Sequence, residues 1–223
     1  MIKGIIFDLD GVIVSTDDYH YQAWKKIAEQ EGIYFNRKIN NRLRGVSRKE
    51  SLEIILEKAN REYDVLEKEN LLIKKNQEYV NSLSTLSKDN ILPGINELIS
   101  YLKIHDYHIA IGSSSKNAKI ILEKIGLRDM FDIIVDGWDV KNSKPAPDLF
   151  LLAAHRLNLS PFECAVIEDA VAGIKAAKAA KMLAIAINLN SDCQLADLNI
   201  KHPKEIIQYL EANNNEELRT FSN

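Results

Sequence analysis

Short apolar runs alternate regularly with amphipathic stretches through the second half of this chain. Four runs, HIAIG, DIIVDG, CAVIED and LAIAIN, have the length and the β-branched content of buried strands, and a helix-like stretch separates each from the next. A fifth run, IKGIIFD, lies near the start. Strands and helices in strict alternation form βαβ units. The sequence therefore predicts an α/β fold, a doubly wound parallel sheet with a Rossmann-like core and helices on both faces.

Residues 16–88 contain no convincing strand and have helical patterns instead. Thr16 is suited to cap a first helix that ends near Gly32. Ser47 and Glu50 form a capping box ahead of LEIIL, and a longer helical pattern follows in LLIKKNQEYVNSL. These patterns predict a helical cap domain that is inserted after the first strand.

The insertion divides the chain into two predicted domains. The α/β core domain comprises residues 1–15 and 89–223, and the helical cap domain comprises residues 16–88. A hinge is expected where the chain crosses between them, near 14–16 and 84–93. The polar tail EANNNEELRTFSN is expected to be frayed.

The composition excludes several kinds of partner. Charged residues make up 27% of the 223 residues and the net charge is −3, so no general attraction to nucleic acid is expected. No apolar run approaches the roughly 20 residues that a membrane span needs. The start MIKGIIFDLD carries acids where a signal peptide needs an apolar segment, and Cys164 and Cys193 lack the spacing of a metal motif. We expect a cytoplasmic protein, monomeric by default, without nucleic-acid or membrane partners.

Two aspartates follow the first predicted strand. Asp8 and Asp10 occupy alternate positions, so in an extended chain both side chains lean to the same side. Two carboxylates about 4 Å apart repel each other by roughly 1 kcal/mol in water and about 4 kcal/mol at an effective dielectric constant of 20. For this motif alone, a solvated Asx-turn explains the pair as well as a binding site does.

The other predicted strands also end in polar residues. Ser113 begins a run of three serines after HIAIG, and Lys144 lies in the loop after DIIVDG. CAVIED ends in Glu168 and Asp169. Taken singly, each has a structural explanation as a helix cap, a solvated loop charge or a turn. In a doubly wound sheet these strand ends converge where ligands bind, so together they favour a phosphate site over a set of turns.

The order of these motifs, DLDGV, a serine after the second core strand, KP and ED, resembles the haloacid dehalogenase superfamily of phosphotransferases. The resemblance covers the whole chain, including the helical insertion. Within the superfamily, STDDYHYQAW, RGVSRKESL, KKNQEYV, SSSKN, SKPAPD and EDAVAGI are similar, in order, to segments of the β-phosphoglucomutase family. EDAVAGI is shared with related phosphatases, so it supports the superfamily more than the mutase.

The resemblance implies a role for each motif residue at the sheet edge. Asp8 would be the nucleophile and Asp10 the general acid/base, while Ser113 and Lys144 would contact the phosphoryl oxygens. A carboxylate that attacks a phosphate dianion needs a hard cation with oxygen ligands to offset the repulsion, which agrees with this assignment. The implied ligands of Mg²⁺ are Asp8, the backbone carbonyl of Asp10, Glu168 and Asp169.

A second phosphate site is suggested by RGVSR, in which Arg44 and Arg48 flank a glycine loop and a predicted helix N-terminus. The alternative is a solvated basic face. Arg44 stands where the resembled family carries lysine, which keeps the charge but replaces a compact ammonium with a planar fork. The resemblance implies that the phosphate not undergoing transfer and the sugar contact Arg44, Gly45, Val46, Ser47, Arg48, Ser51, Lys75, Asn76, Ser114, Ser115, Lys116 and Asn117.

His20 and Trp24 are four residues apart and share one face of the first predicted helix. A pair with this spacing packs in a core more often than it lines a site. The resemblance implies instead that His20 positions Asp10, that Trp24 lines the pocket, and that Thr16 belongs to the catalytic set at the hinge.

The implied activity is that of an isomerase acting on small-molecule sugar phosphates. It would interconvert β-D-glucose 1-phosphate and D-glucose 6-phosphate through β-glucose 1,6-bisphosphate and an aspartyl phosphate, with Mg²⁺ as cofactor. One alternative keeps the chemistry but admits water, giving a Mg²⁺-dependent phosphatase of small phosphate esters. Another is a sugar-phosphate binding protein without turnover.

Overall fold

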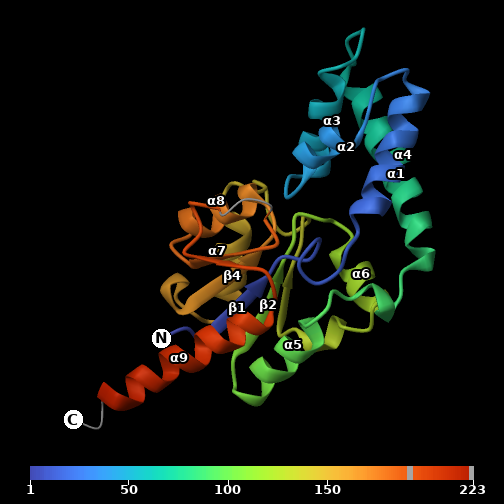
Figure 1. Cartoon of the computed structure of the whole chain (residues 1–223). Coiled ribbons are helices and arrows are strands. Elements are labelled where there is room, and N and C mark those ends of the chain that lie inside the picture. Colours follow the sequence, from blue (N-terminus) through green and yellow to red (C-terminus); the bar gives the residue numbers. More distant parts are fainter. Residues whose placement is uncertain (190–192, 221–223) are drawn as a thin grey trace.

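The sheet lies at the centre of the larger part of the molecule (Figure 1). The structure, a computed structural model, describes residues 1–189 and 193–220, with side chains as far as residue 213. All strand pairs in the sheet are parallel and their order is β3-β2-β1-β4-β5-β6. The strands are β1 (Gly4–Phe7), β2 (His108–Gly112), β3 (Ile133–Val135), β4 (Cys164–Glu168), β5 (Leu183–Ile187) and β6 (Leu198–Ile200).

This order confirms the predicted Rossmann-like core, in which the chain winds outward from β1 in both directions. The five predicted strands are β1 to β5. β6 was not predicted, because it is a three-residue edge strand in a polar stretch. It pairs with β5 from Ile185 opposite Leu198 to Ile187 opposite Ile200.

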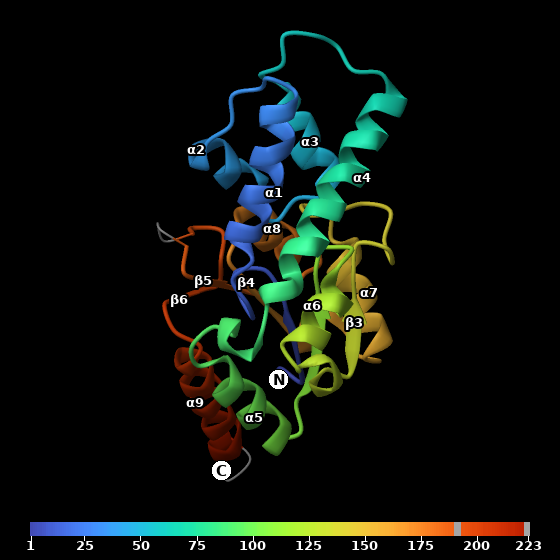
Figure 2. The ribbon, with the colours of Figure 1, turned by 90° about the vertical axis from the view of Figure 1, so that its right-hand side faces the viewer.

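Helices cover both faces of the sheet (Figure 2). One apolar cluster joins the sheet to α5 (Ile95–Ile104), α6 (Ala118–Lys124) and α9 (Lys204–Thr220). A second cluster, on the opposite face, joins it to α7 (Asp148–Arg156) and α8 (Val171–Ala179). Strands buried on both faces are expected to be almost entirely apolar, as β1 and β4 are.

The expectation of a frayed tail is wrong for most of its length. α9 continues through Thr220, and only the last three residues of the tail lie outside the described part of the chain. The polar composition of the tail gave no sign of this helix. The buried apolar residues of α9, Ile206 and Leu210, are four apart on one face, and both lie before the tail.

Residues 16–88, called here the helical region, stand above the carboxyl edge of the sheet (Figure 1). Most of their buried apolar side chains, including Trp24, Leu52 and Leu71, form an apolar cluster separate from those of the sheet. The helices are α1 (Asp17–Gln30), α2 (Arg37–Asn40), α3 (Arg48–Leu56) and α4 (Val65–Ser82). Short 3-10 turns in the described chain are Asn41–Leu43, Leu83–Thr85, Lys88–Asn90, Arg128–Met130 and Pro161–Glu163.

The two crossings between the helical region and the sheet lie side by side. Val14 forms an antiparallel bridge with Ile91, and the amide of Leu92 donates to the carbonyl of Ile13 at 2.9 Å. α4 also reaches the sheet, since Tyr79 near its end belongs to the apolar cluster of α5 and α6. The paired crossings suit a hinge, whereas the division into domains at residues 16 and 88 stays a prediction.

Local capping explains where the helices begin. Ser47 and Glu50 form the predicted capping box at the start of α3, and Asp64 with Glu67 forms another at α4. Thr16 precedes α1 as predicted but makes no capping hydrogen bond. Its hydroxyl is used in the site described below. Among the described helices, none is long and apolar enough to cross a membrane.

Candidate active site

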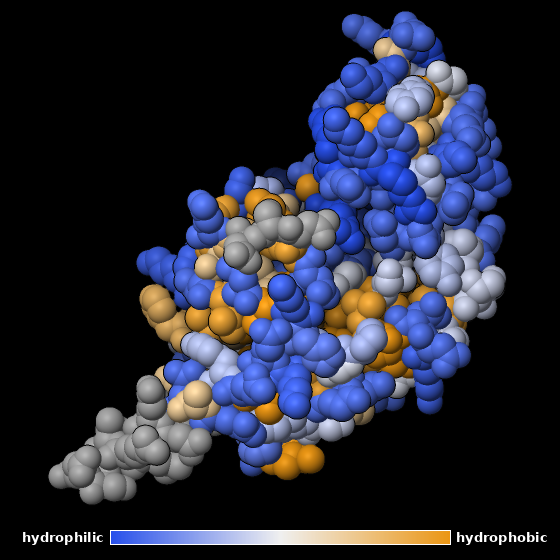
Figure 3. Space-filling model, in the orientation of Figure 1, coloured by the Kyte–Doolittle hydropathy of each residue, from blue (hydrophilic) through white to orange (hydrophobic). Residues whose placement is uncertain are grey.

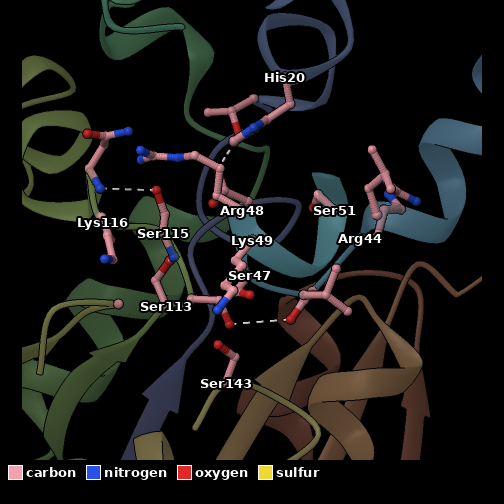
Figure 4. A pocket seen from close by; sticks show the side chains of 18 of the residues that line it. His20, Arg44, Ser47, Arg48, Lys49, Ser51, Ser113, Ser115, Lys116 and Ser143 are labelled. Atoms are coloured by element: carbon pink, nitrogen blue, oxygen red, sulfur yellow. Dashed lines mark hydrogen bonds between the residues drawn. The ribbon is translucent and has the colours of Figure 1, made fainter. Parts of the chain in front are cut away.

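A cavity of about 420 Å³ lies between the carboxyl edge of the sheet and the helical region. Hydrophilic side chains dominate the face of the helical region seen in Figure 3. In Figure 4, Lys116 and Ser115 lie on one side of the cavity, Arg44 and Ser51 on the other, and His20 above. The predicted residues that line it are Asp8, Asp10, Thr16, His20, Trp24, Arg44, Gly45, Val46, Ser47, Arg48, Ser51, Lys75, Ser113, Ser114, Ser115, Lys116, Asn117 and Asp169.

Asp8 and Asp10 come directly after β1. Asp8 is buried, and Asp10 accepts a hydrogen bond from the Thr16 hydroxyl. Gly11 has a φ of 87°, and a Cβ at this position would overlap the carboxylate of Asp169. The turn therefore requires glycine in order to bring the two aspartates close to the end of β4. Burial, followed by repulsion from Asp8, raises the pKa of Asp10 to about 6.

Lys144 lies beneath the cavity and is fully buried. Its Nζ is 2.5 Å from Asp8 Oδ1 and 2.5 Å from Glu168 Oε1. Burial alone would lower the pKa of Lys144, but the two carboxylates outweigh it and raise this pKa above its usual value. Lys144 is therefore a fixed positive charge at the base of the site.

Asp8, Glu168 and Asp169 form a buried acidic cluster, with one oxygen from each within 4.8 Å of the others. Burial and neighbouring carboxylates raise the pKa of Glu168 to about 7 and that of Asp169 to about 8. Lys144 is one positive charge beside three carboxylates, so the cluster carries excess negative charge when all three are ionised. Three oxygen donors with excess negative charge fit a hard divalent cation such as Mg²⁺. Which ion binds here is a proposal taken up below.

The loop after β2 supplies small polar groups. Ser113 is buried, and its hydroxyl accepts a hydrogen bond from the Ser115 amide at 3.1 Å. The Ser115 hydroxyl in turn accepts from the Asn117 amide at 3.2 Å. These two bonds hold the loop in a tight turn, with Ser114 and Lys116 on the cavity wall.

The helical region reaches the sheet edge through Arg44 and Gly45. Arg44 Nη2 lies 3.6 Å from Asp169 Oδ2, and the Gly45 carbonyl accepts a hydrogen bond from Ser114 Oγ at 3.3 Å. Gly45 has a φ of 74°, and a Cβ there would lie 2.8 Å from the Cβ of Ala170. This close approach explains the glycine in RGVSR.

His20 and Lys75 face each other across the helical region. Lys75 Nζ, on α4, lies 2.8 Å from His20 Nδ1 and 5.1 Å from the centre of the Trp24 ring. The His20 ring also stacks on Tyr79, with centres 4.1 Å apart. Burial, then the nearby cations, lower the pKa values of both His20 and Lys75 well below their usual ranges. Trp24 packs in the apolar cluster of the helical region and also lines the cavity. It therefore combines the two roles considered for its spacing, core packing and pocket lining.

Three predicted residues do not line the cavity. Lys144 and Glu168 are fully buried beneath it, where Lys144 contacts Asp8 and Glu168. Asn76 lies behind the wall, where its side-chain oxygen accepts a hydrogen bond from Asn117 Nδ2 at 2.9 Å.

Sequence reasoning missed several lining residues, and most carried no signal. Asp17 was assigned to a helix start, but its carboxylate accepts a hydrogen bond from Asn40 Nδ2 at 3.0 Å across the helical region. Ser143 is adjacent to the KP motif, which could have identified it. The lining residues outside the predicted set are Gly11, Asp17, Asn40, Leu43, Lys49, Leu72, Gly137, Val140, Lys141 and Ser143.

Four of the cations that line the cavity have no carboxylate partner among the described residues. Arg48, Lys49, Lys116 and Lys141 all line it, and in the described part of the chain none of them forms an ion pair. An unpaired cation keeps its charge available for an anionic ligand. The cavity therefore combines a buried carboxylate, an acidic cluster able to hold a metal ion, and separate cationic walls.

Comparisons with known proteins agree with this geometry. The chain is 44% identical over 207 residues to a β-phosphoglucomutase of Bacillus subtilis, covering 92% of each protein. It is 31% identical over 217 residues to a phosphorylated carbohydrates phosphatase of Thermotoga maritima, covering 94% of this chain and 98% of the relative.

A crystal structure of β-phosphoglucomutase from Clostridium difficile has a TM-score of 0.91 and 39% identity, covering 98% of this chain and 99% of that one. The haloacid dehalogenase-like hydrolase family matches residues 2–181. Together with the strand order and the acidic cluster at the carboxyl edge of the sheet, these matches show that the chain belongs to the haloacid dehalogenase-like hydrolase family.

Proposed function

We propose that this protein is a β-phosphoglucomutase, an isomerase that interconverts β-D-glucose 1-phosphate and D-glucose 6-phosphate. The observation that supports the proposal is that one cavity is lined by two separate sets of groups suited to a phosphate. We place one beside Asp8 and above Lys144, and the other among the unpaired cations Arg48, Lys49 and Lys116 of the cavity lining. A sugar bisphosphate that turns round within the site needs both.

In the proposed cycle, Asp8 carries the phosphoryl group as an aspartyl phosphate. The sugar 6-hydroxyl of β-D-glucose 1-phosphate attacks this phosphorus, the bond to Asp8 breaks, and Asp10 accepts the hydroxyl proton. The product is β-D-glucose 1,6-bisphosphate. After the bisphosphate turns round, Asp8 attacks the C1 phosphoryl group, and Asp10 returns the proton to the sugar O1. Glucose 6-phosphate then leaves, and Asp8 is again phosphorylated.

Several contacts support these roles. Lys144 orients Asp8 at 2.5 Å and offsets charge on the transferring group. The pKa of about 6 allows Asp10 to exist in both protonation states near neutral pH, as an acid/base requires. Thr16 holds Asp10 in the present conformation, and we infer that His20 takes over as its partner during the reaction.

We propose Mg²⁺ as the cofactor, bound by Asp8, Glu168, Asp169 and the backbone carbonyl of Asp10. When bound, it would offset the repulsion between the Asp8 carboxylate and the phosphoryl oxygens. The three side chains supply the hard oxygen ligands that Mg²⁺ prefers. We also propose that residues 16–88 act as a cap whose closure excludes water, which would otherwise hydrolyse the aspartyl phosphate.

A phosphatase acting on small sugar phosphates is the second candidate. It is supported by the similarity to the Thermotoga phosphatase, which extends over 94% of this chain. Both candidates use Asp8, Asp10 and the acidic cluster. They differ in whether the acceptor of the phosphoryl group is a sugar hydroxyl or water.

The deciding experiment is an incubation with Mg²⁺ and β-D-glucose 1-phosphate, primed by a trace of β-glucose 1,6-bisphosphate. Glucose 6-phosphate and inorganic phosphate are measured in the same sample. The mutase produces glucose 6-phosphate with little phosphate, whereas the phosphatase releases phosphate steadily. An Asp8→Asn variant should be inactive in both assays, and a variant as active as the parent would remove Asp8 as nucleophile. If the parent forms neither product, both enzyme proposals fail and a binding protein without turnover is the remaining candidate.

A further inference from the structure

Trp138, in the loop after β3, is 71% exposed although it is a large aromatic residue. It lies in neither of the sheet's apolar clusters and does not itself line the cavity. Among the described residues, the one polar contact of its side chain is to Lys116: the indole N–H donates to the Lys116 backbone carbonyl at 3.0 Å. In addition, Lys116 Nζ lies 4.0 Å from the centre of the Trp138 ring.

Hydrogen bonds and a close backbone approach fix the loop that carries Trp138 next to Lys116. The amide of Trp138 donates to the buried carboxylate of Asp136 at 2.8 Å, and the amide of Asp136 donates to Asp139 at 3.0 Å. A Cβ on Gly137 would lie 2.5 Å from the carbonyl oxygen of Ser114. Glycine is therefore needed for this loop to approach the loop that contains Lys116 so closely.

The kind of contact matters for the charge on Lys116. A carboxylate partner would both orient and neutralise the ammonium group, as Asp136 does for the nearby Lys119 at 3.1 Å. An aromatic face attracts the ammonium group but leaves its net charge in place. Lys116 lines the cavity and has no carboxylate partner among the described residues, so its charge remains available to an anion.

We propose that Trp138 is a positioning residue for ligand binding: it fixes the backbone and the ammonium group of Lys116 at the cavity wall, where Lys116 binds the phosphate not undergoing transfer. This inference rests on the proposed function, since it assumes a sugar phosphate in the cavity. Trp138 itself does not line the cavity. Its whole effect passes through Lys116, which makes the proposal testable by a mutant cycle.

The experiment compares Trp138→Leu, Lys116→Met and the double variant in steady-state assays with β-D-glucose 1-phosphate and Mg²⁺. Trp138→Leu is expected to raise KM about threefold to fivefold, the range for loss of one exposed cation–π contact, and to change kcat less than KM. In the Lys116→Met background the same change is expected to have no further effect on KM. Trp138→Phe keeps an aromatic face and should recover part of the affinity.

Phe162→Leu is the matched control, because Phe162 is 70% exposed and does not line the cavity. It should leave KM unchanged. An unchanged KM in Trp138→Leu, or an equal rise with and without Lys116, would overturn the inference, the latter pointing to a separate contact of Trp138.

Failure of the proposed function gives a different result. If the parent forms neither glucose 6-phosphate nor phosphate, the proposed function fails, and the same four proteins are compared by calorimetric titration with inorganic phosphate. Positioning of Lys116 predicts weaker phosphate binding by about threefold to fivefold in Trp138→Leu and no added loss in the double variant. Equal phosphate affinity in the parent and Trp138→Leu would then refute the inference on its own.

Discussion

The guanidinium group of Arg44 lies 3.6 Å from the carboxylate of Asp169, so the helical region places a cation against the acidic cluster. Asp169 is almost fully buried, whereas Arg44 is partly exposed. Arg44 lowers the pKa of Asp169, against a larger increase caused by burial and by the other carboxylates. A metal ion at Asp169 and the Arg44 side chain therefore repel each other at short range.

Arg44→Ala is expected to strengthen Mg²⁺ binding in the absence of substrate. Because Arg44 is partly exposed and screened, the gain should be modest, about fivefold in the dissociation constant. Calorimetric titration at pH 9.5, well above the pKa of about 8 of Asp169, keeps proton competition at this carboxylate small. Arg42→Ala is the matched control, since Arg42 pairs with Glu57 instead of the acidic cluster. Equal Mg²⁺ affinities in the parent and Arg44→Ala would show that the charge of Arg44 does not weaken binding of the ion.

Lys144→Met is expected to lower the free energy of unfolding by about 3–5 kcal/mol, because it leaves two buried carboxylates without their cation. Urea denaturation with a chelator present measures the loss. Adding Glu168→Gln to this variant should recover part of it, since one of the stranded charges is removed. Lys68→Met breaks an exposed pair with Glu53 and should cost about 1 kcal/mol or less. If the double variant loses the sum of the single losses, the two side chains are not coupled.

Much of the fold could be predicted because its signals are local. Strands buried on both faces, such as β4, must be continuous apolar runs, and the capping box of Ser47 and Glu50 marks a helix start without tertiary information. The short strand β6 and the helical tail after Leu210 gave no such signal. Their positions depend on pairing with β5 and on one buried turn of α9.

The site residues likewise fall into those that local motifs predict and those that only tertiary packing places. Asp8, Lys144 and Asp169 follow predicted strands, and the topology brings strand ends together, so their proximity followed from the strand order. Asp17 and Lys141 gave no comparable signal, because they reach the cavity only through the packing of the helical region and of a loop. The burial of Glu168 beneath the cavity likewise depends on three-dimensional packing that no motif records.

We expect the stability to depend on pH through His20, because its pKa is lowered in the folded protein. Burial and the cations Lys75 and Arg48 lower the pKa of His20 well below 6.5, so between that lowered value and pH 6.5 the unfolded chain binds a proton that the folded protein does not. Stability contributed by His20 is therefore complete above about pH 6.5 and is lost as the pH falls. The ring of Tyr79 also faces His20 but stays uncharged in this range.

His20→Asn retains an acceptor for Lys75 and removes the titrating group. The difference in unfolding free energy between the parent and His20→Asn should thus be constant from pH 7 to 8 and should shift against the parent at lower pH. Urea denaturation at intervals from pH 8 to pH 5 measures this difference, in which the titration of groups remote from His20 cancels. A difference that does not vary with pH would mean that His20 titrates normally in the folded protein.

Gly45 tests whether closure of the helical region excludes water. Its φ of 74° and the 2.8 Å distance from an added Cβ to the Ala170 Cβ mean that alanine is disfavoured twice, by backbone conformation and by contact with the sheet edge. Gly32 is the matched control in the same region, because its φ is 67° but an added Cβ would meet nothing within 4 Å. Both variants carry the same kind of backbone strain, and only Gly45→Ala obstructs the approach.

Gly45→Ala is expected to raise the ratio of inorganic phosphate to glucose 6-phosphate, because a cap held away from Ala170 admits water to the aspartyl phosphate. A change of about 1.4 kcal/mol in the relative barriers to the two acceptors would raise this ratio tenfold. Both products are measured in one primed reaction with Mg²⁺. Gly32→Ala should lose some stability and keep the parent's ratio. If Gly45→Ala slows the formation of both products equally, the approach of Gly45 to Ala170 affects the rate of catalysis but not the entry of water. Exclusion of water must then depend on other contacts of the helical region.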